Sequence, residues 1–462
     1  MLDALSKGLS HRIVEGLDLV ELRAQDLSQT TARVRDSDVE MLCQKRIFGH
    51  SARVLKNGVW GFAFSDGSTR VVQTIRDAAE AAGAFKSKGA NVRVELASVR
   101  PITRRSKSRA PTPFDKVDVA LKASYLKDVC AGVSEKEPRT GTCWADYSDT
   151  SGNSVLATSE GTVVESDVSE ATITVTASGE SKGVKAYSRE DIGIVTEGWD
   201  YLNKAYPAEE LSRSVACKLT DHLSGEKCSR GSFDCVLGPR VVGMLAHEAL
   251  GHLSEADLFC SGAFSGLGGK RVAPDGVTMV DSPRMKGGFG NIEVDDEGVL
   301  PRKVVLIDDG YLDEQLTNRQ WAARLGMKPT GNARAESYRK APIIRMRNTY
   351  FERGDMTTEE LVENVRTGYY CGDVRGGQAE SNSSFQVGIQ RCYEIRNGRL
   401  GRPVRDLSVS GIALKSLRLI DGVGKDFGFE SSYCGKYDQS IATSDGGPHM
   451  SLKKGAVIFG GA

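Results

Sequence analysis

The sequence lacks several features that would indicate particular classes of protein. Its 462 residues carry 61 Lys and Arg against 61 Asp and Glu, and this zero net charge leaves no electrostatic footprint for nucleic acid. No apolar run reaches the length of a membrane span, and the N-terminus lacks the apolar core of a signal peptide. We therefore expect a soluble cytoplasmic protein that binds neither nucleic acid nor a membrane.

Disulfide scaffolds and nucleotide loops are also absent. The ten cysteines form no C-x-x-C pair, and a chain of this length has enough core to fold without disulfides. We expect reduced thiols, most of them buried. The glycine-rich stretch 261–270 departs from the phosphate-loop pattern G-x-x-x-x-G-K-[ST], because Phe264 replaces the first glycine and Arg271 follows the lysine.

Histidine is scarce too, which makes its distribution informative. Six histidines are present, and His247 and His252 stand five residues apart with Glu248 between them. Neutral imidazoles are the commonest nitrogen ligands of zinc, and a neighbouring carboxylate can take a proton from water that the metal activates. These residues are therefore a candidate metal site. Glu255 and Asp257 are candidates to hold the two imidazoles from outside.

The spacing of the two histidines predicts a distorted helix. Residues 233–237 resemble a short buried strand, Gly238 ends it, and Pro239 suits the first turn of a helix. On a regular helix, residues five apart point roughly 140° away from each other. A turn of π-helix would bring them to the same side, and Gly251 eases such a distortion. We expect a distorted helix at residues 247–252 with both imidazoles on one ion.

Further motifs, in a fixed order, resemble those of a known family. They are His247-Glu248-x-x-Gly251-His252-x-x-Glu255-x-Asp257, Asn291-Ile292-x-x-Asp295-Asp296-Glu297-Gly298, Pro329-Thr330-Gly331-Asn332-x-Arg334-x-Glu336-Ser337-Tyr338, Arg345-Met346-x-Asn348-Thr349-Tyr350, Gly376-Gly377-Gln378, Cys434-Gly435-Lys436 and, more weakly, Gly58-x-Trp60-Gly61-Phe62-Ala63. On these motifs the chain resembles the TldD/PmbA family of peptidases, on the side that keeps the metal residues. The resemblance implies a zinc metallopeptidase in which His247, His252 and Cys434 bind Zn²⁺ and Glu248 is the general base.

The resemblance also implies a substrate and a partner. Peptides or unfolded protein segments would reach an enclosed site in a dimer, either a homodimer or a heterodimer with a TldD/PmbA family paralogue. Asn332 and Arg334 are candidates for holding the peptide. A β-rich domain beside the site suits capture of an extended peptide as an added strand.

Several alternatives stay open at this stage. Cys260 and His449 compete with Cys434 for the place of the third ligand. Asp438 stands where the family usually has glycine, so the local backbone and the charge of the pocket are in question. A hydrolase of non-peptide amides is one alternative function. A non-catalytic partner subunit is another, although the presence of the metal-binding residues disfavours it.

Short apolar runs separated by turn residues predict an α+β fold. We expect an N-terminal α+β unit at residues 1–112, a middle α+β unit at 113–228 and a β-rich catalytic metallopeptidase domain at 229–462. The first two would be α/β-type units with antiparallel strands and helices, and the third would have antiparallel sheets and carry the metal-binding helix. In the middle unit, residues 151–154 predict a turn, and His222 is expected on a helix surface.

Overall fold

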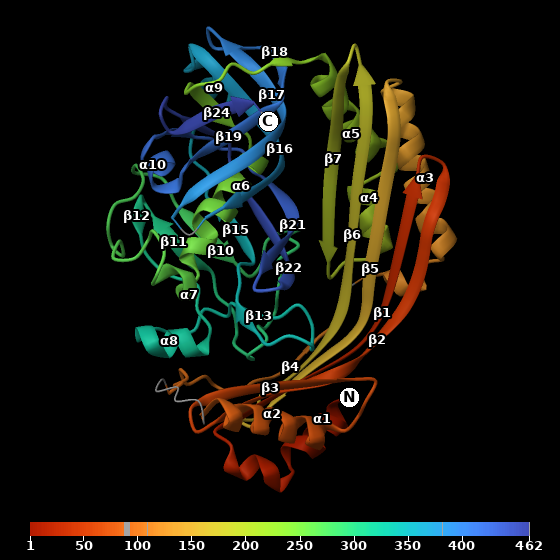
Figure 1. Ribbon diagram of the computed structural model, residues 1–462, viewed down its shortest axis with the longest axis vertical. Coiled ribbons are helices and arrows are strands. Elements are labelled where there is room, and N and C mark those ends of the chain that lie inside the picture. Colours follow the sequence, from red (N-terminus) through yellow and green to blue (C-terminus); the bar gives the residue numbers. More distant parts are fainter. Residues whose placement is uncertain (87–92, 109, 381, 462) are drawn as a thin grey trace.

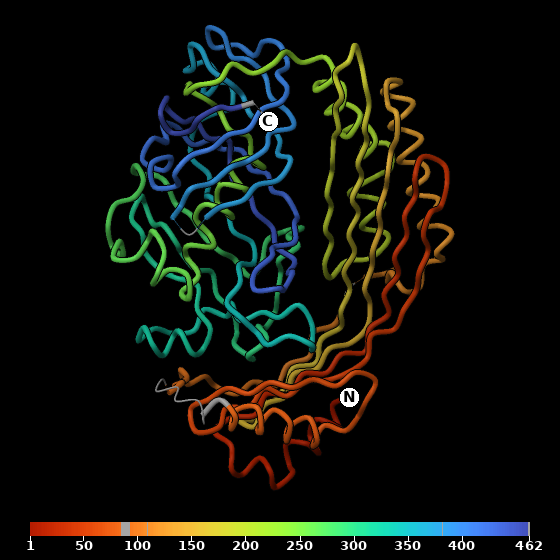
Figure 2. Tube along the Cα trace, viewed as in Figure 1, coloured from red at the N-terminus to blue at the C-terminus, as the bar shows by residue number. Residues whose placement is uncertain are grey.

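The computed structural model of the protein describes residues 1–86, 93–108, 110–380 and 382–461, and one tall, curved sheet dominates it (Figure 1). The long strands rise side by side and then bend at the base beneath the rest of the molecule (Figure 2). Their order is β3-β2-β1-β5-β6-β4, and β7 pairs with β6. The strands are β1 (Leu19–Arg35), β2 (Asp38–Lys56), β3 (Val59–Asp66), β4 (Thr103–Ser106), β5 (Thr140–Thr158), β6 (Val163–Ser181) and β7 (Val184–Val195).

Helices cover this sheet on its outer face and at its base (Figure 1). On α5, Leu211, Val215 and Leu219 recur every four residues, so they form one apolar stripe. That stripe packs in one buried cluster with Ile173 and Val175, which alternate along β6. The helices of this part are α1 (Leu2–Leu9), η1 (Arg12–Gly16), α2 (Val71–Lys86), η2 (Phe114–Lys116), α3 (Val119–Lys136), α4 (Trp199–Ala205) and α5 (Ala208–Ser224).

Two expectations for this region are wrong. Residues 151–154 lie inside β5, where Ser151 pairs with Ser28 of β1 and Ser169 of β6. Pairing on both sides of the strand overrides the local turn preference of Ser, Gly and Asn. His222 is buried rather than exposed, because Asp406 and Arg375 from the C-terminal half contact its imidazole.

The C-terminal half contains two larger sheets, which confirm the predicted α+β class. Their orders are β12-β11-β10-β15-β22-β21 and β20-β23-β9-β16-β17-β18-β8, with β19 joining β17 to β24. Most pairs are antiparallel, but β15 pairs with β22, β16 with β9 and β18 with β8 in parallel. The strands are β8 (Glu226–Lys227), β9 (Asp234–Leu237), β10 (Met279–Ser282), β11 (Val304–Asp308), β12 (Tyr311–Leu312), β13 (Ala333–Arg334), β14 (Ile343–Ile344), β15 (Asn348–Phe351), β16 (Thr367–Ala379), β17 (Ser384–Arg396), β18 (Arg399–Arg405), β19 (Leu407–Ile412), β20 (Ile420–Val423), β21 (Gly428–Lys436), β22 (Gln439–Gly447), β23 (Met450–Leu452) and β24 (Val457–Gly461).

Short helices lie among these strands. The helix α9 begins with the capping box of Thr357 and Glu360, which satisfies two backbone N–H groups at its start. Among the described residues, no helix combines the length and the apolar character that a membrane span requires. The helices are α6 (Pro239–Met244), η3 (Leu245–Gly251), η4 (His252–Ser254), α7 (Ala256–Phe259), α8 (Arg319–Leu325), α9 (Thr358–Glu363) and α10 (Ala413–Arg418).

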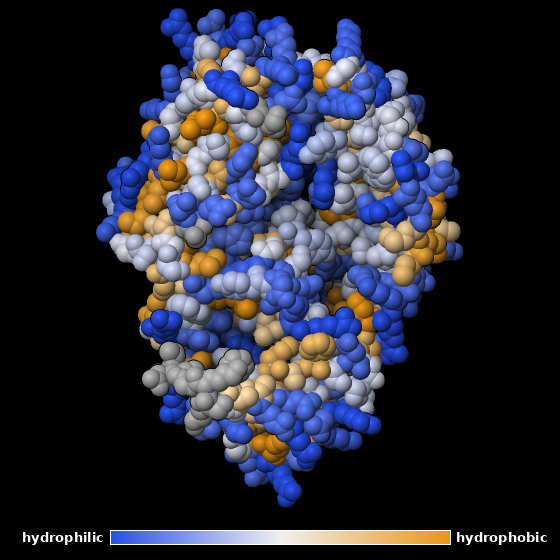
Figure 3. Space-filling view, viewed as in Figure 1, coloured by the Kyte–Doolittle hydropathy of each residue, from blue (hydrophilic) through white to orange (hydrophobic). Residues whose placement is uncertain are grey.

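The concave face of the tall sheet looks towards the C-terminal half, and a recess separates the two on the face shown in Figure 3. Buried ion pairs join them. Glu190 of β7 pairs with Lys218 of α5 and with Arg240 of α6, and Asp373 of β16 pairs with the same two cations. The tall sheet combines strands from the first two predicted units, and the division into three units stays a prediction.

Candidate metal centre

The two histidines lie on a helix whose shape changes at the site. Pro239 occupies the first turn of α6, directly after β9, as predicted. From Leu245 to Gly251 the chain forms the π-helix η3, and one 3₁₀ turn follows. A π-helix brings residues five apart to the same side, so His247 and His252 face one space. The predicted distortion of the helix is confirmed.

Close packing holds this helix on the sheet that carries the rest of the site. A Cβ on Gly243 would lie 2.7 Å from the carbonyl carbon of Asp445 in β22, so only glycine lets the helix approach this closely. The fully buried Ala246 adds a small contact surface one turn later. At the far end, a Cβ on Gly251 would collide with the sulfur of Met346. Small residues therefore set the height of the helix above the sheet.

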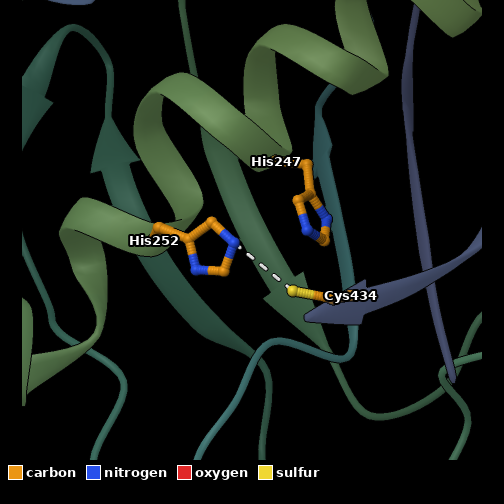
Figure 4. Close-up of side chains that lie close together, drawn as sticks. All are labelled: His247, His252 and Cys434. Atoms are coloured by element: carbon orange, nitrogen blue, oxygen red, sulfur yellow. Dashed lines mark hydrogen bonds between the residues drawn. The ribbon is translucent and has the colours of Figure 1, made fainter. Parts of the chain in front are cut away.

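The third donor comes from β21. Cys434 lies 182 residues after His252 in the chain, yet its Sγ is 3.3 Å from Nε2 of His252. The ligand atoms of His247, His252 and Cys434 all lie within 4.8 Å of one another. The two imidazole rings are perpendicular, with their centroids 5.2 Å apart, and both point towards the sulfur (Figure 4).

This donor set suits a metal ion. Zinc bonds of about 2.0–2.1 Å to nitrogen and about 2.3 Å to sulfur place tetrahedral ligand atoms roughly 3.3–3.6 Å apart. The Cys434 Sγ and His252 Nε2 atoms already have this spacing, at 3.3 Å, and all three donor atoms lie within 4.8 Å of one another. Within the part of the chain that the structure describes, they are the one group of three His, Cys, Asp or Glu side chains with metal-binding geometry. The competing residues lie elsewhere: Cys260 is exposed, and the ring of His449 bonds to Asp426 and Tyr370.

One predicted outer partner contacts an imidazole and the other does not. The fully buried Glu255 is 3.1 Å from Nδ1 of His252, which orients that ring. Asp257 instead bonds to Lys436, whose Nζ lies 2.9 Å from both Glu255 and Asp257. The prediction that Asp257 holds an imidazole is therefore wrong, because its carboxylate pairs with the ammonium group of Lys436 instead.

The outer partner of His247 was missed by sequence reasoning. Asp445 of β22 places its Oδ1 3.5 Å from Nδ1 of His247, and both groups are buried. Neither the His247 Nδ1 nor the Asp445 Oδ2 has a hydrogen-bond partner among the described residues. Asp445 reaches the site through the pairing of β21 with β22, which no local motif reveals.

Opposite charges stabilise one another in this centre. Burial opposes the Cys434 thiolate, but His247 and His252 outweigh it and lower the pKa of Cys434 to about 4. Burial also opposes the His247 imidazolium, yet Cys434 raises the pKa of His247 to about 9. The centre therefore favours the thiolate, the form of cysteine that binds metals. With a carboxylate behind each imidazole, it has the negative character that a divalent cation needs.

Family models match this chain over most of its length. The PmbA/TldA metallopeptidase domain 1 matches residues 20–84, the central domain matches 112–222, and the C-terminal domain matches 230–458. The chain belongs to the PmbA/TldD metallopeptidase family. The resemblance drawn from its motifs is confirmed.

Relatives of this PmbA/TldD family member carry metalloprotease names. A "Metalloprotease" of Methanothermobacter thermautotrophicus is 32% identical over 449 residues, 96% of each chain. A "Zinc metalloprotease TldD homolog" of Saccharolobus solfataricus is 32% identical over 88% of this chain and 89% of its own. The family is thus one of metalloproteases, and a metal ion belongs to its chemistry.

Solved structures share the fold. The crystal structure of a putative modulator of DNA gyrase from Thermotoga maritima has a TM-score of 0.81 at 18% identity, covering 99% of this chain and 100% of its own. TldE from Thermococcus kodakarensis has a TM-score of 0.74 at 18% identity over 99% of this chain and 100% of its own. These likenesses establish the PmbA/TldD architecture for the whole chain.

In this family member, Glu248 lines an open cleft beside the donors. The cleft has a volume of about 320 Å³, and His252, Gly377, Gln378 and Lys436 also line it. Glu248 is half-buried, whereas His247 is buried and does not line the cleft. The carboxylate therefore faces the space that a ligand would enter.

The two residues predicted to hold a peptide lie in the interior. The side-chain amide of Asn332 donates to Asp281 and to the carbonyl of Arg345. The Arg334 guanidinium donates to the carbonyls of Met346 and Ala442. Neither side chain lines the Glu248 cleft. Their contacts join the strands on which the site is built.

The departure at Asp438 has a simple backbone explanation. Tyr437 and Asp438 form the two-residue turn between β21 and β22, with positive φ values of 47° and 56°. Glycine is favoured there, and aspartate is one of the residues that tolerates this conformation. Its carboxylate is exposed and lies 2.6 Å from Nζ of Lys340. Asp438 therefore changes the surface at the hairpin tip and leaves the three donors untouched.

Proposed function

We propose that this protein is a zinc-dependent peptidase in which His247, His252 and Cys434 bind the ion and Glu248 is the general base. The observation that carries the proposal is the convergence of two imidazoles and one thiolate beside a carboxylate that faces an open cleft. Three protein ligands leave the fourth tetrahedral position free, as in catalytic zinc sites.

The chain's own residues divide the chemistry between them. A bound zinc ion lowers the pKa of water to about 7 and polarises a carbonyl oxygen. Glu248 accepts the proton of the attacking water and passes it to the leaving amine. Glu255 orients the ring of His252 by a hydrogen bond, and the Asp445 carboxylate lies 3.5 Å from Nδ1 of His247 as its charged partner. The closeness of Gly243 to β22 keeps both rings near Cys434.

The substrate that fits best is an extended peptide. The strand β16 pairs with β9 only at residues 368–371, and among the described residues its later part has a partner on one side, β17. The strand β21 is likewise an edge strand, paired with β22 alone in the described chain. These open edges border the Glu248 cleft and can receive a peptide as an added strand.

The test compares two isosteric substitutions in the zinc-loaded protein. Glu248→Gln should keep one zinc ion per chain and lose at least about 100-fold in kcat, as expected for removal of a general base. Glu359→Gln, at an exposed site on α9, is the matched control and should cleave peptide libraries like the wild type. Undiminished cleavage by Glu248→Gln would remove Glu248 from the mechanism.

We also propose that the substrates are unfolded segments and that the protein works as a dimer, with itself or with a family paralogue. A recessed site admits an extended chain more easily than a folded domain. A denatured protein should therefore be cut much faster than its native form, and equal rates would contradict the idea. Light scattering of the purified protein, alone and mixed with a paralogue, measures the assembly.

A further inference from the structure

A second hollow lies beyond Cys434, on the side away from the Glu248 cleft. It has a volume of about 380 Å³, within the range of small-ligand pockets. Residues 430–433 of β21 line it, whereas residues 435 and 436 line the cleft. Residues 374–376 of β16 line the hollow, and 377–379 line the cleft. The two hollows therefore lie end to end along the same two strands, with Cys434 between them.

Two side chains that line this hollow have a buried atom without a hydrogen-bond partner among the described residues, Glu430 at Oε2 and Arg375 at Nε, and Glu430 is the acidic one. Alternate residues of a strand share a face, so Glu430 and Cys434 lie on the same face of β21, about 13 Å apart along the strand. The Oε2 atom of Glu430 is shielded from solvent and accepts no hydrogen bond from the described residues. Such a carboxylate is costly to bury unless a cation or a donor pairs with it.

Each arginine around the hollow contacts a group other than Glu430, although the Nε of Arg375 has no hydrogen-bond partner among the described residues. Arg189 pairs with Asp191 at 2.5 Å. Arg375 lies 2.7 Å from Nδ1 of His222 and over the ring of Tyr187. The third cation, Arg240, is held by the buried acids of β7 and β16 described above.

The electrostatic surroundings of Glu430 favour its neutral form, which a nearby positive charge would reverse. Burial raises the pKa of Glu430 to about 8, Asp445 and Asp373 add to the rise, and Arg240 opposes it. A cation brought into the hollow would favour the charged carboxylate and gain a charge-assisted hydrogen bond.

We propose that this hollow is a substrate subsite in which Glu430 pairs with a positively charged group of the bound peptide. The inference rests on the proposed peptidase function and adds a substrate class to it. The 13 Å along β21 corresponds to about four residues of extended peptide. The positive group is therefore expected about four residues from the scissile bond. Two sources share this chemistry, a Lys or Arg side chain and a free N-terminal ammonium.

The test measures peptide binding without turnover. Zinc-loaded Glu248→Gln protein is titrated with fluorescent peptides in which one lysine is moved through each position, with norleucine as the neutral replacement. One position should bind about tenfold more tightly with lysine, and that preference should fall below about twofold in Glu248→Gln/Glu430→Gln. If peptides with a free N-terminus lose the same tenfold on acetylation, the ammonium is the source.

Two outcomes overturn the proposal: neither a lysine at any position nor a free N-terminus strengthens binding, or the preference survives Glu430→Gln. Zinc content and Tm establish that the Glu430→Gln protein is folded, and Glu359→Gln serves as the control at an exposed site. Wild-type protein is assayed for cleavage of the same peptides. Absence of all cleavage would refute the peptidase function, while the binding titration still decides the role of Glu430.

Discussion

Replacing Gly243 with alanine would test how the helix height controls the metal centre. The new Cβ would lie 2.7 Å from the carbonyl carbon and oxygen of Asp445 and from the nitrogen of Gly446. Ordinary contacts between such atoms are about 3.5–4.0 Å, so the helix must retreat by roughly 1 Å. Strand backbone cannot rotate aside as a side chain does. His247, one turn further along, would move with the helix.

The expected cost follows from this displacement. Overpacking of a core contact destabilises a protein by about 1–3 kcal/mol, which urea denaturation measures. Loss of support for a ligand imidazole weakens metal binding by about 10–100-fold. Competition with a chromophoric chelator should therefore show zinc affinity reduced by at least tenfold in Gly243→Ala.

A matched glycine provides the control. Gly83 also lies within a helix, α2, and a Cβ there would have no neighbour within 4 Å among the residues that the structure describes. Gly83→Ala should leave zinc affinity unchanged and raise the free energy of unfolding by up to about 1 kcal/mol, because alanine favours helix. If Gly243→Ala binds zinc and resists urea as well as the wild type, close packing does not set the geometry of the centre.

Three further predictions concern the outer partners, the interface and the ion. Asp445→Asn should weaken zinc binding by about 10–100-fold in the same titration without loss of fold, because His247 loses its anionic partner; unchanged affinity would exclude that role. Burial opposes the charge of Glu190, but Arg240 and Lys218 outweigh it and lower the pKa of Glu190 to about 2. Ionised Glu190 thus stabilises the folded state by about 3 kcal/mol. This contribution is complete above the ordinary pKa of 4.5 and is lost as the pH falls through 2. Glu190→Gln should remove that part of the acid dependence of urea unfolding, and an identical dependence would contradict it. Removal of metal with a chelator should lower Tm, and restored zinc should raise it in proportion to the logarithm of its concentration; a Tm insensitive to zinc would show that the folded chain does not bind it.

Local chemistry predicted the parts of the fold that neighbouring residues determine. Pro239 after Gly238 predicted the start of α6, and the five-residue histidine spacing predicted the π-helix. The hairpin tip at Asp438 was not predicted, although its positive φ values agree with the preference of two-residue turns. The helix start and the helix distortion depend on a few adjacent residues, so the sequence is sufficient to predict them.

Features that depend on distant strands were beyond local reasoning. Residues 151–154 have turn composition but lie between two long neighbours, β1 and β6, which impose an extended backbone. Asp445 supports His247 only because β22 pairs with β21. His222 is buried by Asp406, 184 residues further along the chain. Convergence of this kind needs the tertiary structure.

The position of Cys434 was another feature that could not be predicted from neighbouring residues. Its separation of 182 residues from His252 gave no physical reason to choose it over Cys260, and the choice rested on family resemblance. The structure places the sulfur beside both rings. Substrate-holding residues were the weakest prediction, because a motif marks positions in a chain without saying which side chains face a cleft. Asn332 and Arg334 face the interior.

X-ray absorption at the zinc edge of the purified, zinc-loaded protein tests the central claim most directly. The account predicts one sulfur at about 2.3 Å and at least two imidazole nitrogens at about 2.0–2.1 Å. The sulfur shell should disappear in Cys434→Ala, while Cys260→Ala should leave the spectrum unchanged. A wild-type spectrum with only nitrogen and oxygen neighbours would contradict a metal centre built from His247, His252 and Cys434.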